Sequence, residues 1–331
     1  MFSLVLYIPN NSHDPHFNLA FEEYVLKNLA LAEPCLLLWQ NEPTVVVGRF
    51  QNTQEEINQE FIKQHQVHVV RRITGGGAVY HDLGNLNFTF IKKGRERVLV
   101  FHKFTEPVVK ALAAMGVSAE YRGRNDLTIK GKKVSGNSQY HCRGKTMHHG
   151  TLLLAANLDH VEQALSVSSD KFQSKGVKSV RSRVTNISEH LPSPITMEEF
   201  KALLLKHLFQ GQAVREYSLT ERDLAQINRL RAEKYLTWSW NYGHSPAFNF
   251  KKRKRFLCGE IEVCLHIEAG IIKECKFYGD FFSNENLADL EQKIVGLKYT
   301  EDVLATIIKR GEIERYFGKV SSEEVLSLFF P

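Results

Sequence analysis

Strand-like segments in this chain follow one another across turns that are too short to hold a helix. Residues 35–39 and 44–48 are apolar runs separated by a turn at 41–43, and other strand-like runs lie at 86–91, 126–137 and 151–155. Parallel neighbours need a crossover of about a dozen residues, whereas antiparallel neighbours can be joined by a short turn. We therefore expect an α+β fold with a mixed, largely antiparallel sheet flanked by helices, in which residues 35–48 form a hairpin.

Helical periodicity marks the segments that cover this sheet. Asp14-Pro15 is typical of an N-cap followed by proline at the first helical position, so we expect a helix from about 16 to 31. Further helices are expected at 53–65, 103–115, 196–209 and 220–235. Beyond them, two strand-like runs flank Ala269-Gly270, and helices are expected at 284–294, 300–309 and 321–329. We expect a large domain at 1–245, a small α+β domain at 246–331, and a solvated linker around 244–255 that carries Lys251–Arg255.

Composition excludes several classes of protein. No window approaches the roughly 18 consecutive apolar residues of a membrane span, and the short apolar run at the amino terminus is expected to be a first strand rather than a signal peptide. A cytoplasmic protein is expected. Five cysteines without a C-x-x-C pair make disulfides and structural zinc unexpected. The residues before 250 carry 30 basic against 23 acidic side chains, which suits an anionic ligand or an acidic protein partner.

A glycine-rich segment follows the strand expected at 67–70. It begins Arg71-Arg72-Ile73-Thr74-Gly75-Gly76-Gly77 and continues through Ala78, Val79, Tyr80 and His81 to Asn85. Consecutive glycines leave backbone N–H groups uncovered, and two arginines beside them add fixed positive charge, so the segment can bind an anion. The alternative is a tight turn with surface arginines. The run is not a dinucleotide fingerprint, because Tyr80 stands where G-x-G-x-x-G requires its last glycine.

A second segment places a lysine between glycines. It reads Gly131-Lys132-Lys133-Val134-Ser135-Gly136-Asn137 and follows Gly123-Arg124-Asn125-Asp126-Leu127. A lysine held in such a strand can reach a phosphate or carbonyl oxygen as a point charge, although the segment can also be a solvated hairpin tip. Gly144-Lys145-Thr146 is not the end of a Walker A loop, because Gln139 replaces the glycine that would wrap the phosphate.

Taken together, these segments resemble those of bacterial lipoate–protein ligases, a family that shares its catalytic fold with biotin–protein ligases. The matching stretches are R-R-x-x-G-G-G-A-V-Y-H-D-x-G-N, G-R-N-D-L, K-V-S-G and the later Lys175–Val184, and the similarity extends from Asp14-Pro15 to the last helices. The resemblance implies that ATP and lipoate form lipoyl-AMP and pyrophosphate, and that the lipoyl group then passes to a lysine of an acceptor protein.

The resemblance also implies the residues of the site. Lys133 would contact the lipoyl carbonyl oxygen and the α-phosphate, and Asp126 would position that lysine or hold Mg²⁺. ATP and the adenylate would be bound by Arg72, Gly75, Gly76, Gly77, Ala78, Val79, Tyr80, Asn85, Lys133, His149, Lys178 and Arg181. Lipoate would be bound by Arg72, Gly76, Lys133 and His149. The stretch 174–183 corresponds to a loop that closes over the adenylate in this family.

The family also indicates the partners and a few secondary roles. The expected acceptors are apo lipoyl domains of 2-oxoacid dehydrogenase E2 subunits or the glycine-cleavage H protein, and a monomer is expected. From the residues themselves, His81-Asp82 can be an acid/base pair or His81 can be structural. The second alternative is at least as well supported, because adjacent side chains of an extended segment point to opposite faces.

Three rival interpretations stay open. A transferase of the same fold would use a cysteine thiolate and no ATP, with Cys142 as its candidate because Thr146 occupies the register of the family's nucleophile. A relay enzyme would carry lipoyl groups between carrier proteins. A binding module of another class would use Lys251–Arg255 for nucleic acid.

Overall fold

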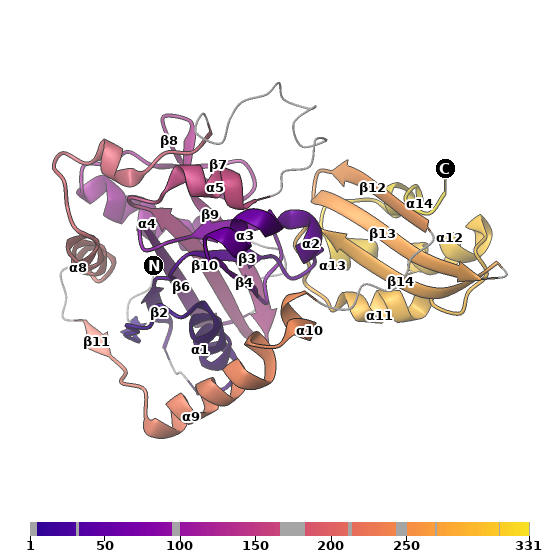
Figure 1. Cartoon of the computed structure of the whole chain (residues 1–331), viewed down its shortest axis with the longest axis horizontal. Coiled ribbons are helices and arrows are strands. Elements are labelled where there is room, and N and C mark those ends of the chain that lie inside the picture. Colours follow the sequence, from indigo (N-terminus) through magenta and orange to yellow (C-terminus); the bar gives the residue numbers. More distant parts are fainter. Residues whose placement is uncertain are drawn as a thin grey trace. The chain divides into compact units, whose positions relative to one another are not determined.

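The computed structural model of the chain forms two compact units, which are described separately (Figure 1). The described residues are 5–30, 33–94, 100–165, 183–210, 214–242, 250–268, 270–310 and 312–330. The first unit contains Met1–Val46, Glu55–Val70 and Val79–Asn241. The second contains Val47–Gln54, Arg71–Ala78 and Tyr242–Pro331, so two short segments from the amino-terminal part group with the carboxyl-terminal part. A domain boundary at 245 stays a prediction, since 243–249 lie outside the described residues.

An eight-stranded sheet is the centre of the first unit, in the order β11-β1-β2-β6-β10-β9-β8-β7. Its strands are β1 (Leu6–Tyr7), β2 (Cys35–Trp39), β6 (Asn85–Lys93), β7 (Glu120–Arg122), β8 (Asp126–Ile129), β9 (Lys132–Cys142), β10 (Lys145–Leu153) and β11 (Arg215–Glu216). Only β1 pairs in parallel, with β2 and β11, and the other pairs are antiparallel. The expectation of a mixed, largely antiparallel sheet is confirmed.

The expected hairpin at 35–48 is wrong. β2 pairs with β6, whereas β3 (Thr44–Val47) belongs to a separate three-stranded sheet with β4 (His68–Arg71) and β5 (Val79–His81). Hydrogen bonds from α1 (Pro15–Lys27) fix the turn between the two strands. The side-chain amide of Asn18 donates to the carbonyl oxygen of Gln40 at 2.7 Å and to Asn41 Oδ1 at 2.9 Å. The chain is thereby carried from one sheet to the other instead of folding back.

Helices cover both faces of the large sheet. One face packs Leu36, Phe88 and Phe90 against α4 (His102–Ala114) and α8 (Met197–Leu208) in a continuous apolar core. The opposite face contacts α1, whose N-cap Asp14 accepts hydrogen bonds from the His16 and Phe17 amides as the sequence predicted. Other helices that the structure describes in this unit are α3 (Gln59–Gln64), α5 (Leu158–Ala164), η1 (Ile187–His190), α9 (Glu221–Leu230), the π-helical turn η2 (Arg231–Tyr235) and α10 (Trp238–Asn241). The short helix α2 (Thr53–Glu56) contributes its last two residues to this unit and its first two to the second.

Two expected elements are divided. The strand expected at 126–137 is the β8–β9 hairpin, because Lys130 and Gly131 both have positive φ, 49° and 78°, as a two-residue turn of type I′ requires. The helix expected at 53–65 is two short helices, since Asn58 caps a new one by accepting from the Phe61 amide.

Among the described residues, no helix combines the length and apolar character needed to cross a membrane.

The second unit has its own sheet and core. Strands β12 (Phe250–Phe256), β13 (Gly259–Glu268) and β14 (Ile271–Gly279) form an antiparallel sheet. Helices α11 (Leu287–Ile294), α12 (Glu301–Arg310), α13 (Ile313–Phe317) and α14 (Ser322–Leu326) pack apolar side chains onto it. Phe50, from the segment Val47–Gln54, stacks on Phe281 at 5.1 Å between ring centroids. The small α+β domain expected from the sequence is present.

The basic run Lys251–Arg255 is not a solvated linker, which corrects the expectation. It lies within β12, opposite the acidic side chains of β13. Arg253 is 2.5 Å from a carboxylate oxygen of Glu262 and 3.7 Å from one of Glu260, and Arg255 is 3.5 Å from Asp280. The run is therefore part of a folded sheet, and three of its five basic side chains pair with carboxylates of the same unit.

Candidate functional site

Lys133 and Asp126 form an ion pair on the β8–β9 hairpin. The Nζ atom of Lys133 lies 2.8 Å from Oδ1 of Asp126, and both side chains are about one-third exposed, 37% and 35%. The register shifts between Leu127 and Thr128, so Lys133 pairs with Thr128 while Gly136 pairs with Asp126. Paired residues of antiparallel strands share a face, and this bulge puts Lys133 and Gly136 on one face although they are three residues apart. The lysine ammonium therefore lies over Gly136.

Gly136 provides the space that the ammonium occupies. A Cβ atom added at this position would lie 2.9 Å from Nζ and 3.1 Å from Cε of Lys133. The backbone around Lys133 is fixed from the other side, because its carbonyl oxygen accepts a hydrogen bond from the Thr185 amide at 3.0 Å and Val184 forms a parallel bridge with it. Lys133 is thus held at both its backbone and its side chain, with about a third of that side chain exposed.

A buried hydrogen-bond chain fixes the start of β8. Asn137 lies in β9, and its amide nitrogen donates to the carbonyl oxygen of Asn125 at 3.0 Å, while the Asn125 side chain donates to the carbonyl oxygen of Asn137 at 2.6 Å. Oδ1 of Asn137 is 3.1 Å from Nε2 of His148, and Nδ1 of His148 is 3.0 Å from Nε2 of Gln139. These partners require a neutral imidazole with its proton on Nε2. Asp126, the next residue after Asn125, is positioned by this chain.

His149 belongs to a second buried group that the sequence did not reveal. Its Nδ1 atom lies 2.8 Å from Oε1 of Glu22 on α1, whose side chain is 1% exposed. The same oxygen accepts a hydrogen bond from Thr89 at 2.6 Å, and Thr89 accepts one from the indole nitrogen of Trp39 at 3.0 Å. Glu22 and His149 are 127 residues apart in sequence, so no local pattern indicates their pairing. The structure adds Glu22, Thr89 and Trp39 to the environment of a predicted site residue.

The residues that follow the glycine-rich segment serve mainly to hold β5 and β6. The Tyr80 hydroxyl is 3.2 Å from Nδ1 of His160, and burial together with Asp82 raises the pKa of Tyr80 to about 12. Val79 precedes Tyr80 in β5, and Asn85 is fully buried at the start of β6. His81 is 3.2 Å from the Asn41 amide nitrogen inside the unit, and Asp82 accepts from the Gly84 and Asn157 amides. These contacts agree with a structural role for His81.

Arg72 and the three glycines lie in the second unit. The Arg72 side chain is buried, and its Nη2 atom donates to the carbonyl oxygens of Gly75 at 2.8 Å and Gly77 at 2.9 Å. Its Nε atom donates to Thr74 at 3.0 Å. The guanidinium therefore organises the loop that the sequence analysis assigned to a ligand, and it does so through the loop's own carbonyl groups.

The glycines are required by close backbone approaches. Gly76 has a φ of 95°, and its amide donates to the carbonyl oxygen of Phe281 at 3.2 Å. A Cβ added at Gly75 would lie 2.4 Å from that same oxygen, and one at Gly48 would lie 1.9 Å from the carbonyl oxygen of Gly76. In this structure, glycine at these positions permits packing within the second unit. Gly77 and Ala78 are half-buried at the end of the segment.

The remaining predicted residues are divided between the two units or lie outside the described part. The first unit brings together Lys133 with Asp126, and separately His149 with Glu22. Lys178 and Arg181 lie in 166–182, outside the described residues. The chain enters that stretch from Leu165, which bridges Ile57, and leaves it at Arg183 and Val184 beside Lys133. Among the described residues, no group of three or more His, Cys, Asp or Glu side chains gathers as a metal site.

Cys142 lies far from the lysine that the sequence analysis selected. It ends β9, whereas Lys133 stands near the beginning, and nine residues at about 3.3 Å each separate them by about 30 Å along the strand. Thr146, in the register of the transferase nucleophile, is hydrogen-bonded to His141 at 2.8 Å and to the carbonyl oxygen of Gly94 at 2.7 Å. The β9–β10 turn at Arg143 and Gly144 has positive φ at both residues, which is a hairpin rather than a phosphate loop.

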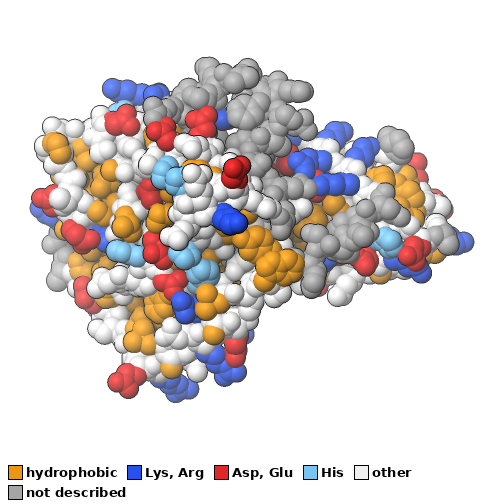
Figure 2. All heavy atoms as spheres, in the orientation of Figure 1, with side chains coloured by type: hydrophobic (Ala, Val, Ile, Leu, Met, Phe, Trp, Pro, Cys, Tyr) orange, Lys and Arg blue, Asp and Glu red, His pale blue; other side chains and the backbone are white. Residues whose placement is uncertain are grey.

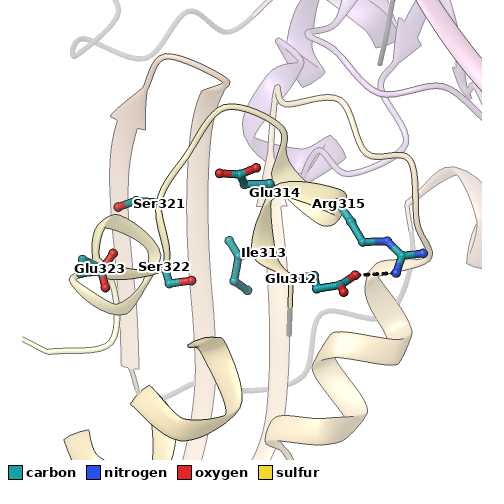
Figure 3. Close-up of a pocket in the computed structure, with 7 residues that line it drawn as sticks. All are labelled: Glu312, Ile313, Glu314, Arg315, Ser321, Ser322 and Glu323. Atoms are coloured by element: carbon teal, nitrogen blue, oxygen red, sulfur yellow. Dashed lines mark hydrogen bonds and ion pairs between the residues drawn. The ribbon is translucent and has the colours of Figure 1, made fainter. Parts of the chain in front are cut away.

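A surface hollow of about 500 Å³ in the second unit contains none of the predicted site residues (Figure 3). Its lining includes Glu312, Glu314 and Glu323 with Ser321 and Ser322. Arg315 at its edge is committed to Glu312 at 2.5 Å and to Glu285 at 2.8 Å. The acidic lining does not suit an anionic carboxylate or nucleotide.

Comparisons with known proteins assign the family. Residues 14–209 match the lipoyl protein ligase A/B catalytic domain, and residues 245–329 match the bacterial lipoate protein ligase C-terminus. The lipoate–protein ligase LplJ of Bacillus subtilis is 45% identical over 98% of this chain and 100% of its own. The crystal structure of P. falciparum LipL1 in complex with lipoate matches with a TM-score of 0.78 and 26% identity, over 98% of each chain.

A crystal structure of a lipoate–protein ligase A bound with ATP also matches. Its TM-score is 0.63 at 26% identity, over 73% of this chain and 99% of that one. The two domain matches, the full-length relative and these structures agree with one another. The chain therefore belongs to the lipoate–protein ligases, a family of ATP-dependent ligase enzymes.

Proposed function

We propose that this enzyme joins lipoate to a protein lysine in two steps. The lipoate carboxylate attacks the α-phosphorus of ATP, pyrophosphate leaves, and lipoyl-AMP forms. The ε-amino group of an acceptor lysine then attacks the lipoyl carbonyl carbon, AMP leaves, and an amide is formed. Family membership supports the reaction, and the observation that carries its assignment to residues is the Lys133 ammonium held 2.8 Å from Asp126 with a third of its side chain exposed.

Lys133 is the proposed source of charge stabilisation in both steps. Negative charge builds on the α-phosphate as the carboxylate attacks, and on the carbonyl oxygen as the amine attacks. A cation already fixed where that charge appears needs no reorganisation during the reaction, and such electrostatic stabilisation is often the largest contribution to catalysis. The Thr185 hydrogen bond and the Asp126 ion pair supply that fixation, since they restrain the backbone and the side chain of the same residue.

Asp126 is proposed to hold the ammonium before substrates arrive. Its carboxylate would yield the lysine to the phosphate when ATP binds, because the triphosphate carries several negative charges against the single charge of one carboxylate. The same carboxylate is the candidate ligand for Mg²⁺, which enters with the triphosphate and needs only one or two protein carboxylates. Arg72, Gly75–Tyr80 and Asn85 are proposed to line the nucleotide by similarity to the family, with Lys178 and Arg181 as further contacts.

His149 is proposed to line the lipoate site together with the buried group around it. Glu22, Thr89 and Trp39 hold the imidazole in one orientation through hydrogen bonds of 2.6 to 3.0 Å. The proposed acceptors are apo lipoyl domains of E2 subunits and the H protein of glycine cleavage. The thioester route through Cys142 has no support from the geometry, because that cysteine lies at the opposite end of β9 from Lys133.

The test compares adjacent lysines on one strand. Purified enzyme with ATP, Mg²⁺, lipoate and an apo lipoyl domain is assayed for pyrophosphate and for the acceptor's mass increase. Lys133→Gln should lower pyrophosphate formation by about 100- to 1,000-fold, the usual effect of losing one preorganised donor. Lys132→Gln is the matched control, because it removes the same charge from a neighbouring exposed residue whose side chain lies on the other face of the strand.

Two outcomes would contradict the proposal. Adenylate formation by Lys133→Gln at the rate of Lys132→Gln would remove Lys133 from the reaction. Acceptor modification by the wild-type enzyme without pyrophosphate release would contradict adenylation and favour a carrier-to-carrier transfer.

A further inference from the structure

The tip of the β8–β9 hairpin and the adjacent end of β7 carry three exposed basic side chains. Arg122 ends β7, Lys130 lies in the hairpin turn, and Lys132 begins β9. All three are exposed, and we name them the basic tip. We propose that the basic tip is the docking surface for an acidic acceptor domain, an inference that rests on the proposed function because the acceptor lysine must reach the carbonyl held at Lys133.

The fold brings Arg122 to the hairpin turn that lies between Lys130 and Lys132. A Cβ added at Gly131 would lie 3.1 Å from Nη1 of Arg122, so the guanidinium lies over the turn between the two lysines. Blue side chains project at the end of this hairpin at the upper left of Figure 2. Arg122 and Lys130 are eight residues apart in the sequence. The pairing of β7 with β8 brings them close together in the fold.

The charges of the basic tip are not neutralised locally. Within the described residues, no ion pair involves Arg122, Lys130 or Lys132. Asp126, the residue opposite Arg122, pairs with Lys133. Glu120 and Glu189 line hollows together with Lys130 and Lys132, but neither forms a described ion pair with them.

The basic run of β12 shows the opposite arrangement. Its two arginines pair with Glu260, Glu262 and Asp280 of the same unit, so that their guanidinium groups already have carboxylate partners. An uncompensated cluster attracts an oppositely charged partner over roughly a Debye length, about 8 Å at physiological ionic strength. The three side chains of the basic tip, which form no described ion pair, are therefore more open to an external carboxylate than the two arginines of β12.

The position of the basic tip suits the protein substrate. Lys132 and Lys130 precede Lys133 by one and three residues, which is at most about 10 Å along the chain. A standard protein interface covers about 800 Å² on each partner, or a disc with a radius of about 16 Å. An acceptor whose lysine reaches Lys133 would cover the tip, together with the hollows of about 410 and 660 Å³ that Lys132 and Lys130 help to line.

The test removes the charges without changing the backbone. The triple variant Arg122→Gln, Lys130→Asn, Lys132→Gln keeps an asparagine in the turn because asparagine tolerates the positive φ of 49° at that position. Its matched control is Arg222→Gln, Lys206→Gln, Lys273→Gln, which removes three other exposed basic side chains. The acceptor probe is the apo lipoyl domain of a 2-oxoacid dehydrogenase E2 subunit.

The expected result is a specific defect in the second step. The triple variant should form lipoyl-AMP, trapped as the hydroxamate without acceptor, at the wild-type rate. Its kcat/KM for the lipoyl domain should fall about 10-fold at roughly 20 mM salt, chiefly through KM, and by under about twofold at roughly 0.5 M salt. The control triple should show neither change.

Four outcomes would overturn the inference, and they differ from one another. Equal acceptor kinetics of the two triples at low salt would exclude the tip from docking. Loss of lipoyl-AMP formation in the tip variant would place the tip in the small-molecule site. Competition by duplex DNA at physiological salt would indicate a nucleic-acid surface. If wild-type enzyme forms no lipoyl-AMP, the proposed function fails, and docking of an acceptor at this tip fails with it.

Discussion

Replacing Gly136 by alanine should separate catalysis from stability. The added methyl group would lie 2.9 Å from Nζ of Lys133, where ordinary contacts are 3.4 Å or longer, so the ammonium must move by about 0.5 Å or rotate away from Asp126. Gly136 does not have a positive φ, so alanine is compatible with its backbone. The perturbation is therefore directed at one cation, and it leaves the strand intact.

The expected size follows from how steeply catalysis depends on position. A misplacement of about 1 Å can cost roughly 100-fold in rate, so a shift of about half that size should lower adenylate formation by about 10- to 30-fold, or ~1.4 to 2 kcal/mol in activation free energy. Stability should be unchanged or higher, because glycine in a strand is destabilising by about 0.5 to 1 kcal/mol relative to alanine. A slower enzyme with an equal or raised melting temperature is the predicted combination.

A double-mutant cycle decides whether Gly136 acts through Lys133. Pyrophosphate formation is measured for wild type, Gly136→Ala, Lys133→Ala and the double variant, with thermal unfolding followed in parallel. If the methyl group works only by displacing the ammonium, it should have no further effect once the ammonium is gone. Additive losses in the double variant, or full activity in Gly136→Ala, would refute the positioning argument.

Two further predictions concern other parts of the first unit. Cys142→Ser should keep at least about half of the ligase activity, because Cys142 lies about 30 Å along β9 from Lys133; a total loss in a mass assay of the acceptor would favour a thioester intermediate. Burial lowers the pKa of His148 well below its usual range, with His149 adding to the effect. The stability that depends on neutral His148 is thus fully present above the unfolded pKa of about 6.5 and is lost as the pH falls below it, by about 1.4 kcal/mol per pH unit. Urea unfolding of wild type and His148→Gln between about pH 7.5 and 5 should show this one-proton difference in slope, and equal slopes would contradict it.

The elements that the sequence predicted well are those with strong local signals. Asp14-Pro15 marks the start of α1, and the structure shows the cap as expected. The failures are long-range. Nothing near residues 35–48 reveals that β2 will pair with β6 and β3 with β5, because strand pairing is decided by side chains from distant parts of the chain. The basic residues of β12 look like a solvated linker until the carboxylates of β13 stand beside them.

The residues of the candidate site also fall into two groups, those that the sequence predicted and those that it did not reveal. Lys133 and Asp126 are seven residues apart, and the family resemblance predicts a role for both, although the bulge that puts the lysine over Gly136 has no sequence signal. Glu22 could not be found from the sequence, because its partner His149 belongs to a strand 127 residues later. Buried polar groups of this kind are selected by mutual hydrogen bonding, and only the folded chain brings the partners together.

Two glycines inside adjacent strands explain how polar groups are accommodated beside the proposed reaction centre. Glycine weakens a strand interior, yet β9 contains Gly136 and β10 contains Gly150. A Cβ at Gly150 would lie 2.2 Å from Oδ1 of Asn137, as one at Gly136 would lie 2.9 Å from Nζ of Lys133. Each glycine leaves room for one polar side chain. Gly150 makes room for the Asn137 amide that anchors Asn125, and Gly136 makes room for the ammonium that pairs with Asp126. The sheet thus gives up local strand stability at two positions and accommodates the polar groups that hold Asn125 and pair with Asp126.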